Sequence, residues 1–521
     1  NTYTGTTRVE AGLLQVAATD VIPYGVGKGV VELYAAGAFD LNGRDVRING
    51  VQGEGLVTNT LGSAQTLRVG ETNIFAFFSG KIAPSVTVRK MNAGASYQLD
   101  CGADPRVNPA VDSGVLALQN VSRLQSPITV AAGAQASLRA AANGLMAEFI
   151  DYTPVNSGGV DTNLLTAASV NALFARYTPT ISTNSVHLGL AFDYGAMTTC
   201  KFPGKYANGA TERFAARWRG RFYAPVDGTY TFGLSSDDCS MLFINDAVVV
   251  SNNVFQGYQS GLPQRSGTIA LTAGYYRIMM AFCELTGDQG LTAYVTLPGC
   301  QRTLLPQALL DYAVNDTDTT AVNTLSGSTM SGSGVAEKAG CPALTVVSDN
   351  SAFTGSWIVR NGILRLGNGG ASGLLGGTQV ALTNTDSCLA INRSNAVTLA
   401  QSIGGIGSIR QEGAGTTTLT GVNTYSGGTT IDQGVVRVVS PGTLGSGVLT
   451  NNGALVFELD QQYAKSKVAP YSSVVGSGTI DVKSGSLLLD QDISGGYQVS
   501  GTGSSYLTAT NINAVTLAGG T

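Results

Sequence analysis

The sequence predicts an all-β protein built largely from short, stacked strands. Gly accounts for 68 of 521 residues, about twice the usual ~7%, whereas charged residues make up 12%, about half the usual ~25%. Small residues, Thr, Asn and Gly alternate regularly with aliphatic residues, a composition typical of an extracellular β-solenoid. One central stretch, Trp218 to Asp246, differs in kind from the chain on either side of it.

Charge and hydropathy exclude several classes of protein. A net charge of −4 offers no basic stripe for phosphates, so we expect no nucleic-acid partner. The content of Val, Ile, Leu and Thr is too high for a disordered coil. No apolar run approaches the ~18 residues that span a bilayer, so we expect no transmembrane segment. The chain begins at Asn1 rather than Met, which favours export after removal of a leader, to the extracellular space or a bacterial cell surface.

An internal repeat supports the solenoid. The first sixteen residues, NTYTGTTRVEAGLLQV, align without a gap on NTYSGGTTIDQGVVRV at Asn423 to Val438. The pattern predicts short alternating strands at Arg8–Glu10 and Leu13–Val16, separated by Gly12, where the backbone turns a corner without a Cβ. Further copies lie at Phe39–Asn59 and Val86–Gly102. A single coil cannot bury its apolar face, so the repeats must stack.

These segments resemble the autotransporter-associated β-strand repeats of bacterial surface proteins. Their pattern, GAGTLTLTGxNTYSGGTTIxxGxLxL, is nearly complete at Gly413 to Val438, and further copies lie at Glu337–Asn368 and Gly476–Gly501. The resemblance covers about Asn1–Ala140 and Val335–Thr521. It implies two right-handed parallel β-solenoid arms on a surface protein.

The central stretch carries two adjacent carboxylates. Strands are expected at Thr229–Leu234 and Met241–Ile244, and Asp237 and Asp238 lie in the polar loop between them. Adjacent carboxylates repel each other unless a cation, a proton or several hydrogen-bond donors compensate them. The pair therefore indicates a cation with oxygen ligands, and a solvated turn is the alternative.

From Asn143 to Leu310 the chain resembles the protective-antigen-type β-sandwich family, the PA-fourteen family. The motifs that carry the resemblance are RWRGRFYAPVDGTYTFGLSSDD and SGTIALTAGYYRIMMAFCE. Flocculin-related members bind calcium through an Asp-Asp pair joined by a cis peptide, together with an Asn and main-chain oxygens of a later loop. The resemblance thus implies one calcium ion on Asp237 and Asp238. Glu284 stands where the family has Asn, and Glu284 or main-chain oxygens from Thr286 to Asp288 complete the site.

The cysteines suggest one or two bridges in an oxidising compartment, with buried free thiols as the alternative. Cys239 directly follows the Asp pair and Cys283 directly precedes Glu284. If the two loops share a metal ion, these cysteines lie near the Cα separation of ~5.5 Å that a disulfide needs. We therefore expect a Cys239–Cys283 disulfide, and Cys200–Cys300 as a second pair.

The expected fold is all-β, with two solenoid arms and an inserted antiparallel β-sandwich. The expected domains are a solenoid over residues 1–142, a sandwich over 143–310, a linker over 311–334 and a second solenoid over 335–521. Asp316 and Asp318 in the third segment are spaced like calcium-loop carboxylates but lack the later Glu, which favours a solvated linker.

The sequence offers little catalytic chemistry. The single histidine, His187, alternates with aliphatic neighbours and is expected to be structural. A polysaccharide lyase or hydrolase on a β-helix would need a basic group beside paired acids, and the arms are poor in both. We therefore expect no enzyme. Two functions remain open: a structural fibre subunit that displays the sandwich laterally, and a calcium-dependent adhesin that binds cell-surface or extracellular glycans.

The fibre hypothesis predicts an assembly contact at the two chain ends. Asn1, Thr2 and Tyr3 begin in the middle of a repeat, and Thr516, Leu517 and Gly519 match the strand that precedes it elsewhere. Placing Thr521 of one copy against Asn1 of another restores an almost unbroken motif. End-to-end contacts that do not close propagate as filaments, so we expect head-to-tail homopolymers.

Overall fold

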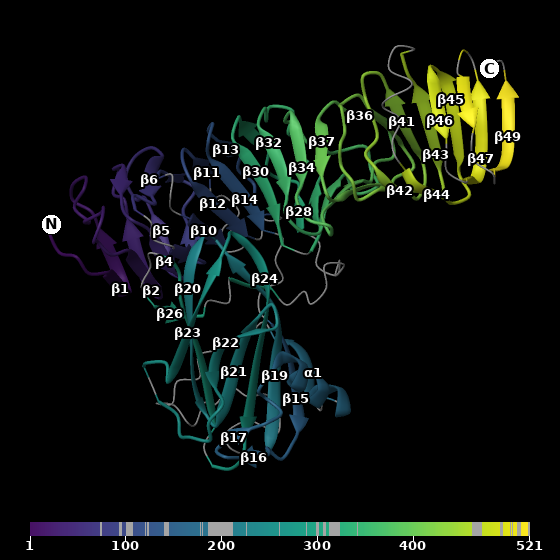
Figure 1. The fold of residues 1–521 in the computed structure, drawn as a ribbon. Coiled ribbons are helices and arrows are strands. Elements are labelled where there is room, and N and C mark those ends of the chain that lie inside the picture. The colour runs from purple at the N-terminus through teal and green to yellow at the C-terminus, as the bar shows by residue number, and fades with distance from the viewer. Residues whose placement is uncertain are drawn as a thin grey trace. The chain divides into compact units, whose positions relative to one another are not determined.

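The computed structural model consists of two compact units (Figure 1). The first contains Asn1–Thr72, Ala76–Ala140 and Thr319–Thr521, and the second is essentially Ala141–Asp318. The structure describes residues 1–72, 76–92, 96–100, 108–119, 121, 124–139, 145–177, 179, 181–185, 212–225, 227–259, 261–287, 289–298, 302–305, 309–311, 323–340, 342–460, 471–489, 493–500, 502, 504–507 and 512–518. His187 lies outside these ranges.

The first unit is a β-solenoid of stacked parallel strands. One sheet contains β1 (Thr7–Gln15), β2 (Val31–Asp40), β4 (Val51–Gly53), β5 (Leu56–Thr58), β7 (Ala76–Phe78), β8 (Lys81–Ile82), β10 (Ser96–Asp100), β12 (Val115–Gln119), β14 (Gln135–Arg139), β30 (Val335–Ala339), β32 (Ser356–Val359), β34 (Gln379–Leu382) and β37 (Ser402–Gly405). A second contains β3 (Val46–Arg47), β6 (Gln65–Val69), β9 (Val86–Lys90), β11 (Asn108–Val111), β13 (Ile128–Val130) and β29 (Met330–Gly332).

The remaining coils of this unit form a third sheet and a short pair. The third sheet contains β28 (Asn323–Leu325), β31 (Leu344–Val346), β33 (Ile363–Leu366), β35 (Cys388–Ile391), β36 (Val397–Leu399), β38 (Ser408–Gln411), β39 (Thr416–Leu419), β40 (Thr429–Ile431), β41 (Val435–Val439), β42 (Gly447–Asn451), β43 (Ala454–Glu458), β44 (Tyr471–Val475), β45 (Thr479–Ser484), β47 (Ile493–Ser500) and β49 (Ile512–Ala518). The pair is β46 (Ser486–Leu489) with β48 (Ser504–Leu507).

Identical alternation in successive coils creates the solenoid core. In β41 the side chains of Val436 and Val438 are buried while their neighbours in the strand are half-buried. The parallel register stacks Val438 between Leu419 and Phe457 of the adjacent coils. Each coil thus supplies one rung of a continuous apolar ladder, as the repeat predicted.

The two solenoid arms are contiguous where the second unit interrupts the chain. β14 pairs in parallel with β30, and β13 pairs with β29. Ser137 and Gln135 donate hydrogen bonds to the carboxylate of Glu337, at 2.9 and 3.0 Å. The expected linker over 311–334 differs from the structure, because β28 and β29 lie within it and belong to the solenoid. Three-residue strands flanked by Ser and Gly are indistinguishable from loops by composition.

The expected corner at Gly12 also takes a different form. Gly12 does have a positive φ of 81°, but β1 continues through it as one strand with a register shift between Val9 and Ala11. The equivalent Gly434 has a φ of 71°, and a Cβ there would lie 2.4 Å from the carbonyl oxygen of Gly413. Only glycine fits this close stacking of coils.

The second unit is an antiparallel β-sandwich. One sheet contains β15 (Leu145–Asp151), β18 (Ile181–Ser185), β19 (Phe214–Ala224), β21 (Cys239–Ile244), β22 (Ala247–Asn252), β24 (Gly274–Glu284) and β27 (Leu310–Asp311). The other contains β20 (Gly228–Asp237), β23 (Arg265–Leu271), β25 (Gly290–Thr296) and β26 (Thr303–Leu304). A small hairpin joins β16 (Asn156–Ser157) and β17 (Val160–Asp161).

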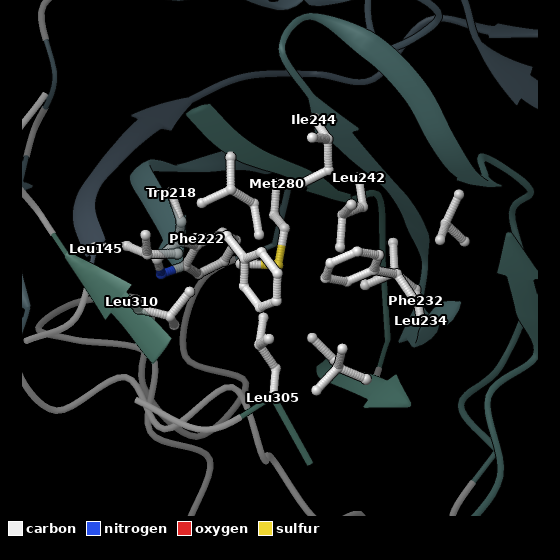
Figure 2. Close-up of a cluster of buried hydrophobic side chains, with 14 of the residues drawn as sticks. Leu145, Trp218, Phe222, Phe232, Leu234, Leu242, Ile244, Met280, Leu305 and Leu310 are labelled. Carbon is white, nitrogen blue, oxygen red and sulfur yellow. The ribbon is translucent and has the colours of Figure 1, made fainter. Parts of the chain in front are cut away.

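Aromatic and aliphatic side chains of both sheets share one core (Figure 2). Trp218 of β19 is fully buried and contacts Phe149 edge to face, with ring centroids 5.8 Å apart. Phe222 makes similar contacts with Tyr230 and Phe232 of the opposite sheet. Trp218 thus belongs to the core of the sandwich.

A helix that the sequence analysis did not predict covers the outer face of the larger sheet. It is α1 (Ala167–Arg176), which Thr166 and Ser169 cap at its N-terminus. Its buried side chains pack with alternate residues of β21, Met241 and Phe243 among them, in a second apolar cluster. Among the described residues, no helix has the length and apolar character needed to cross a membrane.

Candidate metal site

Two chain crossings between the sheets of the sandwich create the site. β20 belongs to the smaller sheet and β21 to the larger, so Asp238, between them, lies where the chain changes sheets. β24 ends at Glu284 in the larger sheet, and the chain returns to the smaller sheet as β25. Asp237 is the register partner of Gly290, so the two crossings lie side by side.

Three carboxylates converge at these crossings. Asp237, Asp238 and Glu284 each place a carboxylate oxygen within 4.8 Å of the others, the single such group of potential metal ligands among the described residues. The peptide bond between Asp237 and Asp238 is cis. Asp237 and Asp238 are 9% and 8% exposed, and Glu284 is fully buried. The structure therefore brings together the three side chains that the sequence analysis named as ligands.

Burial raises the pKa of two of these groups, and repulsion by neighbouring carboxylates adds to the rise for Glu284. The pKa of Glu284 rises from 4.5 to about 9, chiefly because burial disfavours its charged form and then because Asp238 and Asp237 lie nearby. Burial also raises the pKa of Asp238, although the backbone amides of Leu285 and Gln256 offset this in part by hydrogen bonding. The Leu285 amide lies 2.9 Å from Oδ2 of Asp238.

Glu284 lacks the hydrogen bonds that a buried carboxyl group normally has. Both of its oxygens are buried without a hydrogen bond of regular geometry. The backbone amide of Asp238 lowers the pKa of Glu284 only slightly against the larger effects of burial and charge. A bound cation would satisfy these oxygens and compensate the neighbouring carboxylates.

A loop that the sequence analysis missed, Asn252 to Gln264, borders the carboxylates. Nδ2 of Asn252 donates to Oγ of Ser236 at 2.9 Å, and Oγ of Ser236 donates to the carbonyl of Asp238 at 2.6 Å. Oε1 of Gln264 accepts from the Ser236 amide at 2.7 Å and from Gln256 at 3.1 Å. This network fixes the backbone on which the Asp pair is mounted. Five side-chain amides in thirteen residues are the sequence signal that could have indicated it.

The same loop is also attached to the smaller sheet. The hydroxyl of Tyr258 lies 2.5 Å from Oγ1 of Thr292 in β25, and the Tyr258 ring lies against Gly290. Leu262 and Gln259 of this loop are exposed, so it presents both polar and apolar groups to solvent.

Two further residues, Thr286 and Asp288, were expected to contribute main-chain oxygens to the metal site. Thr286 is exposed in the loop after β24, and Asp288 lies outside the described residues. That main-chain oxygens of this loop complete the metal site stays a prediction.

The two central cysteines are adjacent. Cys239 and Cys283 are register partners on β21 and β24, and both are fully buried with free thiols. Their disulfide stays a prediction. Cys200 and Cys300 lie outside the described residues.

The residues expected at the assembly contact are described in part. Asn1, Thr2 and Tyr3 are exposed ahead of β1. Thr516 and Leu517 belong to β49, which pairs in parallel with β47. Gly519 and Thr521 lie outside the described residues.

Comparison with known proteins identifies both parts of the chain. The family described as the PA14 domain matches residues 205–307. The family described as the passenger-associated-transport-repeat matches residues 1–16 and 409–438. These matches confirm the two resemblances drawn from the sequence. No curated protein matches the chain.

Several solved structures are similar to about a third of the chain. An anti-sigma factor domain-containing protein from Clostridium clariflavum is 17% identical, with 33% of this chain and 47% of that chain covered and a TM-score of 0.24. The chain thus spans about half the length of that protein. A PA14 sugar-binding domain from an RTX adhesin is 18% identical over 33% of this chain and 99% of its own, with a TM-score of 0.25. The A domain of epithelial adhesin 6 from Candida glabrata, solved with Galβ1-3GlcNAc, is 17% identical over 34% and 89%, with a TM-score of 0.24.

Proposed function

We propose that this chain is a non-enzymatic extracellular surface protein whose β-sandwich binds glycans through a calcium ion held by Asp237, Asp238 and Glu284. The observation that supports the proposal most directly is the buried group of three carboxylates, in which the oxygens of Glu284 lack regular hydrogen bonds. The β-solenoid carries the sandwich as a continuous scaffold.

The ligand set suits calcium better than transition metals. All three side chains offer oxygen only, and calcium takes six to eight oxygen ligands at about 2.3–2.6 Å in flexible geometry. The cysteines point to the other face of the sheet, into the cluster beneath α1. Three carboxylates that each supply one oxygen leave a calcium shell of six to eight oxygens incomplete, so the ion keeps positions for main-chain oxygens, water or a ligand.

Those open positions suit a carbohydrate. A calcium ion with free coordination sites can accept two neighbouring hydroxyl oxygens of a sugar, which replace water. The loop Asn252 to Gln264 and the exposed Thr286 border the carboxylates and offer amide and hydroxyl groups for further hydrogen bonds. We propose a glycan as the ligand because the PA14 domain family matches residues 205–307.

Calorimetry with the full chain tests this function. Calcium added to chelator-treated protein should bind with a stoichiometry of one per chain, and Asp238→Asn should abolish or greatly weaken the binding. Asp246→Asn is the matched control, because Asp246 lies in the same unit but is exposed and paired with Arg277. Glycan-array binding should require calcium. Equal calcium binding by wild type and Asp238→Asn, or unchanged glycan binding in chelator, would contradict the proposal.

A second proposal is that copies assemble head-to-tail through the solenoid. Among the described residues, β1 pairs with β2 on one side only, and most of its side chains are exposed, Leu13 at 56%. An exposed strand edge presents unpaired amide and carbonyl groups to another chain. Electron microscopy of the purified chain over a wide concentration range should show filaments. Monomers at every concentration would refute assembly.

A further inference from the structure

Cys239 and Cys283 face each other directly behind the proposed metal site. They are cross-strand partners on β21 and β24, and each thiol is a hydrogen-bond partner of the other. Both side chains are fully buried, among apolar residues beneath α1 that include Met241 and Ala281.

Each of the two cysteines is the direct sequence neighbour of a proposed ligand. Asp238 precedes Cys239, and Glu284 follows Cys283. Side chains alternate along a strand, so Glu284 and Phe282 point to the sandwich side of β24 while Cys283 points to the helix side. A change in the distance between the two cysteines therefore also moves Asp238 and Glu284, because one peptide bond joins each of them to its cysteine.

A bond between these sulfur atoms fits the fold with a small contraction. Opposed residues of antiparallel strands have Cβ atoms about 4.5–5.5 Å apart. A disulfide has Cβ atoms about 3.5–4.5 Å apart. The bond thus pulls β21 and β24 together by typically about 1 Å at the ends that carry Asp238 and Glu284.

We propose that Cys239 and Cys283 form a disulfide that locks the ends of β21 and β24 together and raises the calcium affinity of the adjacent site. The affinity effect rests on the proposed calcium function, whereas the disulfide itself does not. The two thiols lose two protons and two electrons and form one S–S bond. The oxidant is a disulfide, either a small molecule or an oxidoreductase of the secretory compartment, and it is reduced to two thiols.

The lock acts by holding ligands in place before the metal arrives. Without it, three mutually repelling carboxylates can separate when the ion is absent, and binding must restore their arrangement. Residues that orient metal ligands change affinity by about 10–100-fold, so we expect at least about tenfold tighter calcium binding in the oxidised protein. By linkage, calcium makes the disulfide harder to reduce by the same factor.

The test uses the full chain in oxidised and reduced forms. Peptide mapping after alkylation without reductant reports the bond, and calorimetry with calcium chloride reports the affinity. If the buried disulfide resists reductant, the double variant Cys239→Ala/Cys283→Ala replaces the reduced protein in the comparison, because it cannot form the bond. Cys388→Ala is the control, because Cys388 lies in β35 of the solenoid.

The expected result is a mapped Cys239–Cys283 bond, with calcium bound at least about tenfold more tightly by the oxidised wild type than by the reduced protein or the double variant. Cys388→Ala should match the wild type in each form. Free thiols at both positions in protein from an oxidising medium, or equal finite affinities in all forms, would overturn the proposal. Absence of calcium binding in every form would overturn both the calcium function and the affinity effect. Equal finite affinities would overturn only the affinity effect and leave the calcium function standing.

Discussion

Replacing Glu284 by Gln should stabilise the metal-free sandwich, because a buried carboxyl group with a pKa of about 9 is costly to keep at neutral pH. In the unfolded chain the group has a pKa near 4.5 and is ionised at pH 7, whereas the folded chain keeps it protonated. The free-energy cost is about 1.4 kcal/mol for each of the 2.5 pH units between 4.5 and 7, or about 3 kcal/mol. Gln has nearly the same shape and no charge to lose.

The sign of the pH dependence follows from the raised pKa. The folded state binds one more proton at Glu284 than the unfolded state does between pH 4.5 and about 9, so the contribution of Glu284 to stability is greatest below pH 4.5 and falls as the pH rises toward 9. Glu284→Gln removes this contribution. The variant should match the wild type near pH 4.5 and exceed it by about 3 kcal/mol at pH 7.

Urea unfolding followed by Trp fluorescence in chelator provides the assay. The chain has two Trp residues, so a Trp357→Phe background leaves Trp218 as a reporter of the sandwich alone. Asp246→Asn is the control, because Asp246 is exposed in the same unit and is not among the charges that raise the pKa of Glu284. Added calcium should reverse the order, since it stabilises the wild type and binds the variant weakly. Equal stability of wild type and Glu284→Gln at pH 7, or a difference that does not grow between pH 4.5 and 7, would refute the reasoning.

Four further substitutions test the packing within each unit. Trp218→Ala should destabilise the sandwich by about 3–5 kcal/mol in urea, because it empties the centre of the shared core, and a change below 1 kcal/mol would be inconsistent with full burial. Arg217→Ala should cost about 3–5 kcal/mol because it leaves the buried carboxylate of Glu148 without the closer of its two arginine partners, whereas Arg277→Ala, at an exposed pair, should cost less than about 1 kcal/mol. Gly434→Ala should lower the melting temperature of the solenoid, because the added Cβ meets the Gly413 carbonyl, and an unchanged melting temperature would contradict that contact.

The solenoid was predictable from sequence because each coil repeats the same alternation. The buried positions of β41 recur in register in β39 and β43, and the alternation of aliphatic residues within the repeat already identifies them. The helix α1 was missed because it is ten residues long and rich in Ala, with no strong contrast to the neighbouring loops. The strands β28 and β29 were assigned to a linker because their burial depends on coils far away in sequence.

The three residues of the carboxylate cluster were predictable because two of them are adjacent and the third lies in a recognisable motif, whereas their role as metal ligands stays a prediction. Their closeness to one another depends on two chain crossings between sheets, which the order of strands alone does not reveal. The cluster of amides around Gln256 and Gln264 indicates a polar network, but the partners of each amide were not predictable, since they belong to strands distant in sequence.

A crystal structure of the full chain grown with calcium tests the central claim most directly. The account predicts an anomalous density peak between β20, β21 and the end of β24, with oxygens of Asp237, Asp238 and Glu284 at about 2.3–2.6 Å from the ion. At saturating calcium, a site without a peak, or a peak that does not contact these three side chains, would contradict it.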